Sequence, residues 1–213
     1  MWNWPEYFRD EIFSGLVVVL QLLAVSAVTT AAWALVILAL RVSPIGVLRF
    51  AGRAYIEFFR GTPLVVQVLA IFAYLPSLGI VLPPFPTAVL AVTLNVGGYL
   101  AESYRVGLQS IPAGQREAAV ALGIPRITVL RRVDIPMSFR VIVPALGNIL
   151  MQILLTTPFV YLVGLQEMMA KGALIQMRTA DFSVYLLIIL IYIGLGLMIS
   201  GAAAWVEHRV RLP

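Results

Sequence analysis

The sequence predicts an all-α integral membrane protein with about five transmembrane helices in a single domain, residues 1–213. Two observations lead to this prediction. Apolar residues make up 61% of the chain and charged residues only 12%, about half the share of ~25% that is usual in soluble domains. The apolar residues also occur in long uncharged runs, and about 20 such residues in a helix cross the ~30 Å hydrocarbon core of a bilayer.

The uncharged runs define the expected spans. The first, Ile12 to Leu40, exceeds the apolar core of a signal peptide and follows an acidic segment, so we expect it to remain in the mature protein. The run from Gly61 to Ala101 is long enough for two spans, which four prolines between residues 76 and 86 separate, because proline disrupts helices. The five expected spans are 14–40, 62–77, 87–107, 141–163 and 183–205.

The distribution of basic residues indicates the orientation, since Lys and Arg accumulate in cytoplasmic loops. Twelve of the 15 lie in the segments 41–60 and 102–140 or in the C-terminal tail. Only Arg9, Lys171 and Arg178 lie on the opposite side. We therefore expect the N-terminus outside and the C-terminus in the cytoplasm. The net charge of +5 then reflects membrane topology, and no nucleic-acid partner is expected.

Several kinds of chemistry are excluded by residue content. The chain has no cysteine and a single histidine, His208, which rules out thiol catalysis, disulfides and a multi-histidine metal site within it. It also lacks the GxxxxGK[ST] phosphate-binding loop and a GxSxG sequence. We therefore expect no catalytic residues, no metal and no cofactor in this chain, and an intramembrane enzyme has no support.

The longest cytoplasmic segment, about 108–136, contains a short helix with both ends marked. Pro112 suits its first turn, and Gly123 with Pro125 suits its termination. Residues of one face, such as Ala118 and Ala121, are small and permit close approach of another surface. The pattern alone leaves two interpretations open: an interfacial helix that joins two spans, or a docking helix for a cytoplasmic partner.

Polar residues interrupt the third and fourth apolar runs at helical spacing. Asn95 and Tyr99 are four residues apart, so both can face one cavity. Asn148, Gln152 and Thr156 form a stripe of the same spacing, with Thr157 beside its end. Such residues either make hydrogen bonds between helices or line a path for a polar solute.

Two charged residues, Glu102 and Arg105, lie three positions apart near the end of the third span. Charges in a membrane are costly and are usually paired. We expect a structural ion pair at the cytoplasmic boundary, and a gating or solute-binding role is the alternative.

Five blocks lie in order between about residues 50 and 165. They are RGTPLVVQ (60–67), GYLAESYR (98–105), IPAGQ (111–115), EAA (117–119) followed by Gly123 and Ile135-Pro136, and PALGN (144–148). In sequence and spacing they resemble the permease subunits of ATP-binding cassette importers, in particular the polar-amino-acid branch with its EAA loop.

The resemblance implies a MetI-like fold in a bacterial-type inner membrane. It also implies a second permease subunit, identical or paralogous, a solute-binding protein, and two ATPase subunits that hold ATP and Mg. Glu117, Ala118, Ala119 and Gly123 would couple this chain to the ATPase. The third and fourth spans would border the solute path, through the residues Asn95, Tyr99, Asn148, Gln152, Thr156 and Thr157.

The expected function is therefore uptake of a polar amino acid or a similar small zwitterion. A compatible solute or an amino-acid derivative is the alternative solute, and a stand-alone carrier or channel is the alternative class. One block departs from the family: where relatives read KDTSL, this chain has Leu155-Thr156-Thr157-Pro158-Phe159. Because buried charges need partners, the loss of that Lys and Asp favours a solute without net charge.

Overall fold

The computed structural model describes residues 6–210, with the side chains of 6–8, 113, 116, 120 and 126 left undescribed. Within these residues the chain is helical throughout, without a strand. The elements are α1 (Glu6–Arg41), α2 (Gly46–Gly61), α3 (Leu64–Tyr74), η1 (Pro76–Leu78), α4 (Pro84–Gln109), α5 (Ala113–Ala121), α6 (Arg126–Val129), η2 (Leu130–Asp134), α7 (Ile135–Thr156), η3 (Thr157–Val163), α8 (Met168–Thr179) and α9 (Ser183–Val210).

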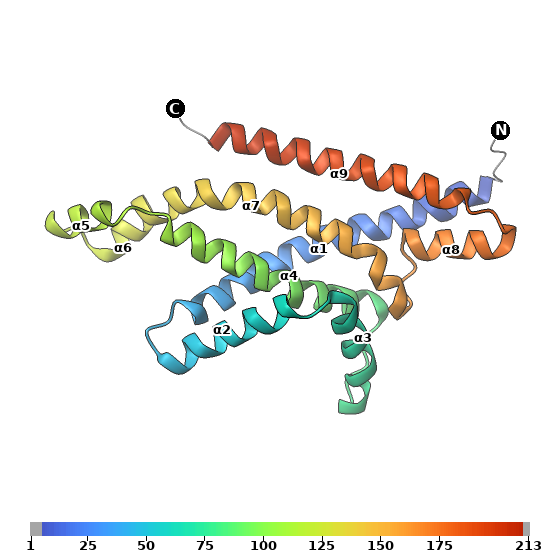
Figure 1. The fold of residues 1–213 in the computed structure, drawn as a ribbon, viewed down its shortest axis with the longest axis horizontal. Helices are drawn as coiled ribbons and strands as arrows, with labels where there is room; N and C mark the ends of the chain where they lie inside the picture. Colours follow the sequence, from blue (N-terminus) through green and yellow to red (C-terminus); the bar gives the residue numbers. More distant parts are fainter. Residues whose placement is uncertain (1–5, 211–213) are drawn as a thin grey trace.

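Four long helices, α1, α4, α7 and α9, run side by side along the long axis of the molecule (Figure 1). Each is long and apolar enough to cross a membrane, and a bent pair of shorter helices raises the count to five. The predicted fold class is thereby confirmed. The helices α5 and α6 form a tip at one end of the stack, and α8 lies at the other end beside the start of α1 (Figure 1).

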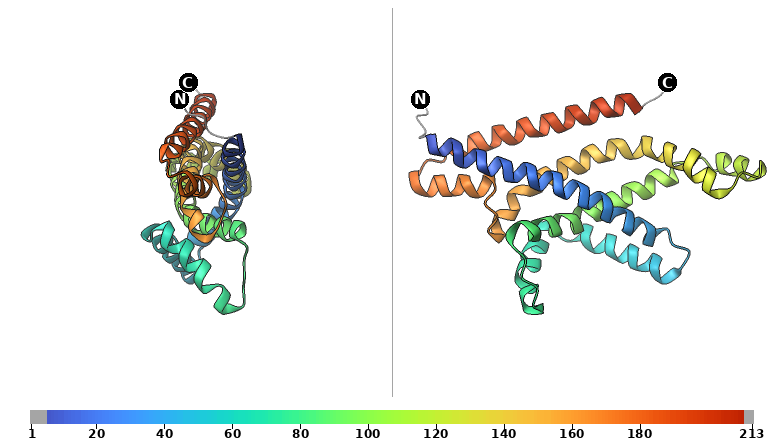
Figure 2. Two further views of the ribbon diagram at one scale, coloured as in Figure 1. Left: turned by 90° about the vertical axis from the view of Figure 1, so that its right-hand side faces the viewer. Right: turned by 180° about the vertical axis from the view of Figure 1, so that it is seen from behind.

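The second span differs from the prediction. The predicted span 62–77 corresponds to the short helices α3 and η1, and α2, which precedes them, meets α3 at an angle of 106°. Thr62 and Pro63 between them have extended backbone, because proline has no N–H for a continuing helix and disfavours helical backbone before it. The helix α2 occupies residues that we expected in a cytoplasmic segment, and α3 turns away from the stack (Figure 2).

The amphipathic sequence of α2 explains its position. Ile56 is buried in a core cluster with residues of α1, α4 and α7, such as Ala34, Val96 and Ile153. The indole of Trp33 donates a hydrogen bond to the hydroxyl of Tyr55 at 2.6 Å, and that hydroxyl donates to the carbonyl of Leu94 at 2.5 Å. These bonds join α1, α2 and α4. Basic residues of α2 such as Arg53 are exposed.

The helix α7 has two features that bear on function. Pro144 lies in its interior, so the carbonyl of Arg140 lacks the N–H that would normally bond to it. Gly147 lies where α7 crosses α9, and a Cβ there would come within 2.5 Å of Ala203 Cβ. Only glycine permits this close crossing, which holds the two helices together.

Candidate functional site

A cavity of about 340 Å³ lies between α4 and α7. Tyr99, Glu102 and Ser103 of α4 line it, because positions three and four residues apart share one side of a helix. Arg60, at the end of α2, also lines it. The remaining lining residues are Val106 of α4 and Val141, Ala145, Asn148, Ile149 and Gln152 of α7. The cavity is therefore polar and carries both signs of charge.

The structure brings together three of the six residues predicted to line the solute path. Tyr99, Asn148 and Gln152 line the cavity. Asn95 is buried outside it, and its amide donates to the carbonyl of Phe59 at 2.9 Å and to Gln67 Oε1 at 3.2 Å. It thus joins α4 to α2 and α3.

The other two path residues, Thr156 and Thr157, lie at the end of α7 outside the lining of the cavity. The hydroxyl of Thr156 donates to the carbonyl of Ile153 at 2.7 Å. Thr157 is fully buried, and its hydroxyl bonds to the hydroxyl of Tyr192 at 2.8 Å. Thr156 therefore bonds within its own helix, whereas Thr157 joins the end of α7 to α9.

Arg60 is a lining residue that sequence analysis did not select. Its guanidinium lies over the ring of Tyr99, 5.0 Å from the centroid, and its carbonyl accepts a bond from the Tyr99 hydroxyl at 3.2 Å. These contacts hold the charge against the cavity wall, since a cation is attracted to the face of an aromatic ring. The sequence feature that could have identified Arg60 is its place in the RGTP block, directly before the bend at Pro63.

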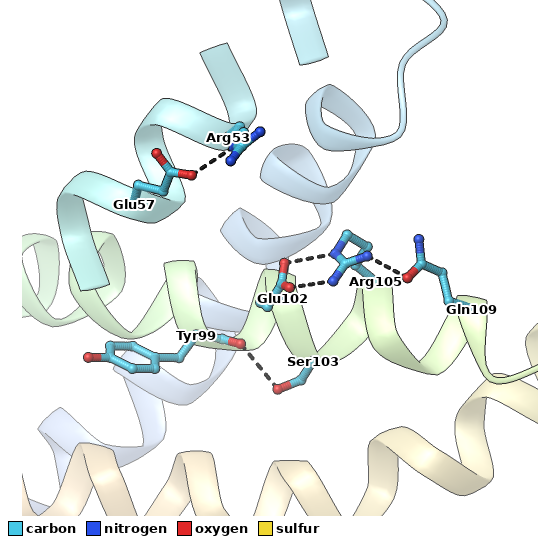
Figure 3. Close-up of polar contacts among 7 residues, drawn as sticks. All are labelled: Arg53, Glu57, Tyr99, Glu102, Ser103, Arg105 and Gln109. Atoms are coloured by element: carbon cyan, nitrogen blue, oxygen red, sulfur yellow. Dashed lines mark hydrogen bonds and ion pairs between the residues drawn. The ribbon is translucent and has the colours of Figure 1, made fainter. Parts of the chain in front are cut away.

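Glu102 and Arg105 form an ion pair with two hydrogen bonds (Figure 3), one of them from Arg105 Nε to Glu102 Oε2 at 2.9 Å. The guanidinium also donates to Gln109 Oε1. Glu102 thus belongs to the cavity wall and to an ion pair at once. The pair Arg53–Glu57 on α2, also drawn in Figure 3, is more exposed.

The predicted coupling residues lie at the tip of the molecule. Gly123 has φ of +67°, and the N–H of Ile124 bonds to the carbonyl of Ala119 at 3.0 Å. This is the hydrogen-bond pattern with which helices end at a left-handed residue. Ala119 is buried, whereas Glu117 and Ala118 are exposed.

Apolar side chains are also exposed at this tip. Leu122 is 76% exposed, and Ile127 of α6 is 56% exposed. Leu122 is four residues after Ala118, so the two share one face of the helix end. Exposed apolar side chains that gather on one face are typical of an interaction surface.

A buried carboxylate, Glu167, lies at the other end of the molecule and was not selected from the sequence. It caps α8, because its two oxygens accept bonds from the N–H groups of Met169 and Ala170, each at 2.8 Å. The Tyr192 hydroxyl also contacts it. Burial raises the pKa of Glu167 to about 7, while these three donors act in the opposite direction.

This raised pKa predicts a pH-dependent stability. The folded protein holds the proton on Glu167 more tightly than the unfolded chain, whose glutamate titrates near 4.5. The stabilisation is complete below about pH 4.5 and is lost as the pH rises through about 7, in total on the order of 3 kcal/mol. We expect the Tm of the detergent-solubilised chain to fall between pH 5 and 8.

Glu167→Gln should flatten this dependence, at a cost of about 1 kcal/mol for the weaker helix cap. Glu57→Gln, a matched change at an exposed glutamate, should leave the fall of Tm with pH unchanged. A slope that persists in Glu167→Gln would show that another group causes it.

The fold and the cavity define a class: a multi-pass helical membrane protein with a polar cavity between two of its spans. Residues 35–212 match the family described as binding-protein-dependent transport system inner membrane component. The chain belongs to this family, which makes it a permease component of a transport system in the inner membrane.

Relatives with assigned names support the family. An L-cystine transport system permease protein of Bacillus subtilis, TcyB, is 34% identical over 172 residues, which cover 80% of this chain and 74% of the relative. An arginine transport system permease protein of the same organism, ArtQ, is 32% identical over 202 residues, covering 94% and 92%.

Solved structures share the fold. The crystal structure of an amino acid ABC transporter with histidines contains a chain that superposes with a TM-score of 0.90, at 32% identity and 95% coverage of both chains. An inward-facing structure of the MetNI methionine ABC transporter gives 0.83 at 18% identity, covering 98% of this chain and all of that one. The second likeness supports the MetI-like fold alone.

Proposed function

We propose that this chain forms half of the translocation path of an ATP-driven importer for a polar amino acid or a similar small zwitterion. The observation that carries the proposal is the cavity between α4 and α7, whose wall presents amide, hydroxyl, guanidinium and carboxylate groups. Its open side would be closed by a second permease subunit. The names of the relatives agree with an amino acid as solute.

The charges of the cavity define the solute further. Arg60 brings a positive charge to the lining that can pair with the carboxylate of an amino acid. The carboxylate of Glu102 is already paired with Arg105, so an ammonium group of the solute would share it with that arginine. A solute with an additional charge would meet no partner for it, and an unpaired buried charge is costly.

Uptake competition in cells that carry the complete transporter tests this proposal. Neutral zwitterionic amino acids should compete better with the transported solute than arginine, lysine or glutamate. Strongest competition by one of the charged amino acids would contradict the assignment.

We further propose that ATP is hydrolysed on two separate ATPase subunits, which bind ATP and Mg and dock at the tip formed by α5 and α6. The connection from α4 to α5 is short, and α6, η2 and α7 follow one another without a break. A displacement of the tip would therefore reach both helices that form the cavity walls. A solute-binding protein would deliver the solute at the opposite end.

In this arrangement α5 and α6 lie in the cytoplasm and the N-terminus lies outside. The excess of basic residues near α2, α5 and the C-terminal tail supports this orientation. Cysteines placed at Ser77 and at Gln115, both exposed, test it in this cysteine-free chain. An impermeant thiol reagent added to intact cells should label Ser77→Cys alone, and labelling of both or of Gln115→Cys alone would reverse or exclude the topology.

A further inference from the structure

An apolar groove of about 400 Å³ runs between α7 and α9, apart from the cavity. Phe139 and Leu150 mark its length on α7, a rise of about 16 Å. The groove is lined by Phe139, Val143, Leu146, Gly147 and Leu150 of α7 and by Met198, Ile199, Ala202, Ala203 and Val206 of α9. Its floor is the close crossing at Gly147, where the side chain of Ala203 packs directly against the glycine. The groove is therefore long, narrow and without polar side chains.

The groove and the solute cavity lie on opposite sides of α7. Val143 and Leu150 line the groove, and Ala145 and Gln152, two residues further in each case, line the cavity. Residues two apart on a helix lie about 200° apart around its axis. A second permease subunit that closes the cavity therefore leaves the groove on the outer surface of the assembly.

The surface around the groove resembles that of a helix in lipid. Exposed large apolar residues extend along α9, among them Leu190, Ile193 and Leu197. The residues of the groove belong to the half of α9 that is closer to the C-terminus, where basic residues accumulate. In the proposed orientation this half faces the cytoplasmic leaflet.

Basic groups lie at the C-terminal end of the groove. Arg209 is one turn beyond Val206 on the groove side of α9, and its guanidinium lies over the ring of Trp205, 5.2 Å from the centroid. Arg140 is next to Phe139 and two turns before Gly147. Among the described side chains, neither arginine has a carboxylate within ion-pair distance, whereas Arg53, Arg105 and Arg178 each have one. Glu207 is one turn beyond Ala203, at the edge of the groove, and is turned about 100° around α9 from Val206.

We propose that an anionic phospholipid of the cytoplasmic leaflet binds this groove, with an acyl chain between α7 and α9 and its phosphate at Arg140 and Arg209. The charge complementarity between two arginines and a phosphate at the end of an apolar slot identifies the occupant. In the proposed orientation, Trp205 would lie near the cytoplasmic membrane interface, where tryptophan is enriched. Basic pockets between transmembrane helices on the cytoplasmic side are typical sites for anionic headgroups. The proposed orientation of the chain determines only in which leaflet the phospholipid lies, and the binding site itself does not depend on it.

Native mass spectrometry of the purified full-length chain tests the proposal, with phosphatidylglycerol and phosphatidylcholine of identical acyl chains added in turn. One phosphatidylglycerol per chain should remain bound at activation energies that release phosphatidylcholine. Arg140→Gln with Arg209→Gln should weaken phosphatidylglycerol binding about 30-fold, since each basic residue contributes roughly a factor of five. Arg49→Gln with Arg131→Gln removes the same charge from exposed positions outside the groove and should change binding little.

A second pair of variants tests the apolar part. Ala202→Trp fills the groove from an exposed position, whereas Leu186→Trp places the same ring on the distant half of α9. Only the former should abolish the retained lipid. Equal binding of the two lipids, or equal effects of the two charge pairs, would overturn the proposal. In the assembled transporter, a photo-crosslinking residue at Ala202 that reacts with another permease subunit instead of lipid would overturn it as well.

Discussion

Replacing Leu122 by aspartate is expected to release the ATPase subunits from the permease and to lower solute uptake at least about tenfold. Leu122 is 76% exposed at the tip of the molecule, and burial of a leucine in an interface stabilises it by roughly 1.5–3 kcal/mol. The substitution removes this contribution and places a charge in an apolar contact, which adds a desolvation cost. Co-purification of the ATPase through an affinity tag on this chain measures the effect.

Leu78→Asp is the matched control. Leu78 is 74% exposed, and it lies in η1, far from α5 along the chain and on another part of the molecule (Figure 1). Its substitution should leave the ATPase bound. If Leu122→Asp retains the ATPase and transports normally, the surface around α5 is not the docking site.

The second large effect is expected in the cavity. Asn148→Leu combined with Gln152→Leu removes two amides from its lining and should lower uptake by about 30- to 150-fold, because each hydrogen bond to the solute contributes about 1–1.5 kcal/mol. The amount of protein in the membrane and the bound ATPase should not change. Uptake of radiolabelled solute into proteoliposomes with ATP inside measures the loss.

Gln166→Leu provides the comparison, since this exposed glutamine precedes α8 and, among the described residues, its side chain bonds to the carbonyl of Gly164 alone, at 3.4 Å. It should transport as the parent does. Normal uptake by the double variant would remove the α7 amides from the solute path and with them the central part of the proposed function.

Much of the fold follows from the sequence, because the length of an apolar run is a local property. The ends of the fourth span show the limit. Residues before 141 carry Arg140 and Pro136, which end the apolar run but not the helix, and α7 begins at Ile135. In the same way, the basic residues of α2 led us to expect a cytoplasmic segment, whereas the chain forms a helix whose apolar face is buried. Hydropathy marks where lipid contact ends, whereas a helix continues as long as its backbone bonds are made.

The candidate site could be predicted only in part. Helical spacing places Asn95 and Tyr99 on one face of α4, but it does not reveal what lies opposite each of them. Asn95 meets Gln67 of α3, a contact that depends on the bend at Pro63. Glu167 was hidden for a similar reason: one acid in a short loop has no pattern, and its role appears only when α8 begins directly after it.

The two walls of the cavity differ in how they can bend. The interior of α4 contains no proline beyond its first turn, so bending it would distort a complete ladder of backbone bonds. In α7 one backbone hydrogen bond is already missing, because Pro144 has no N–H to donate to the carbonyl of Arg140. The interruption lies between the proposed docking tip and the amides of Asn148 and Gln152. Bending α7 at Pro144 breaks no backbone hydrogen bond and therefore has little enthalpic cost. We expect α7 to bend in this way while α4 stays straight.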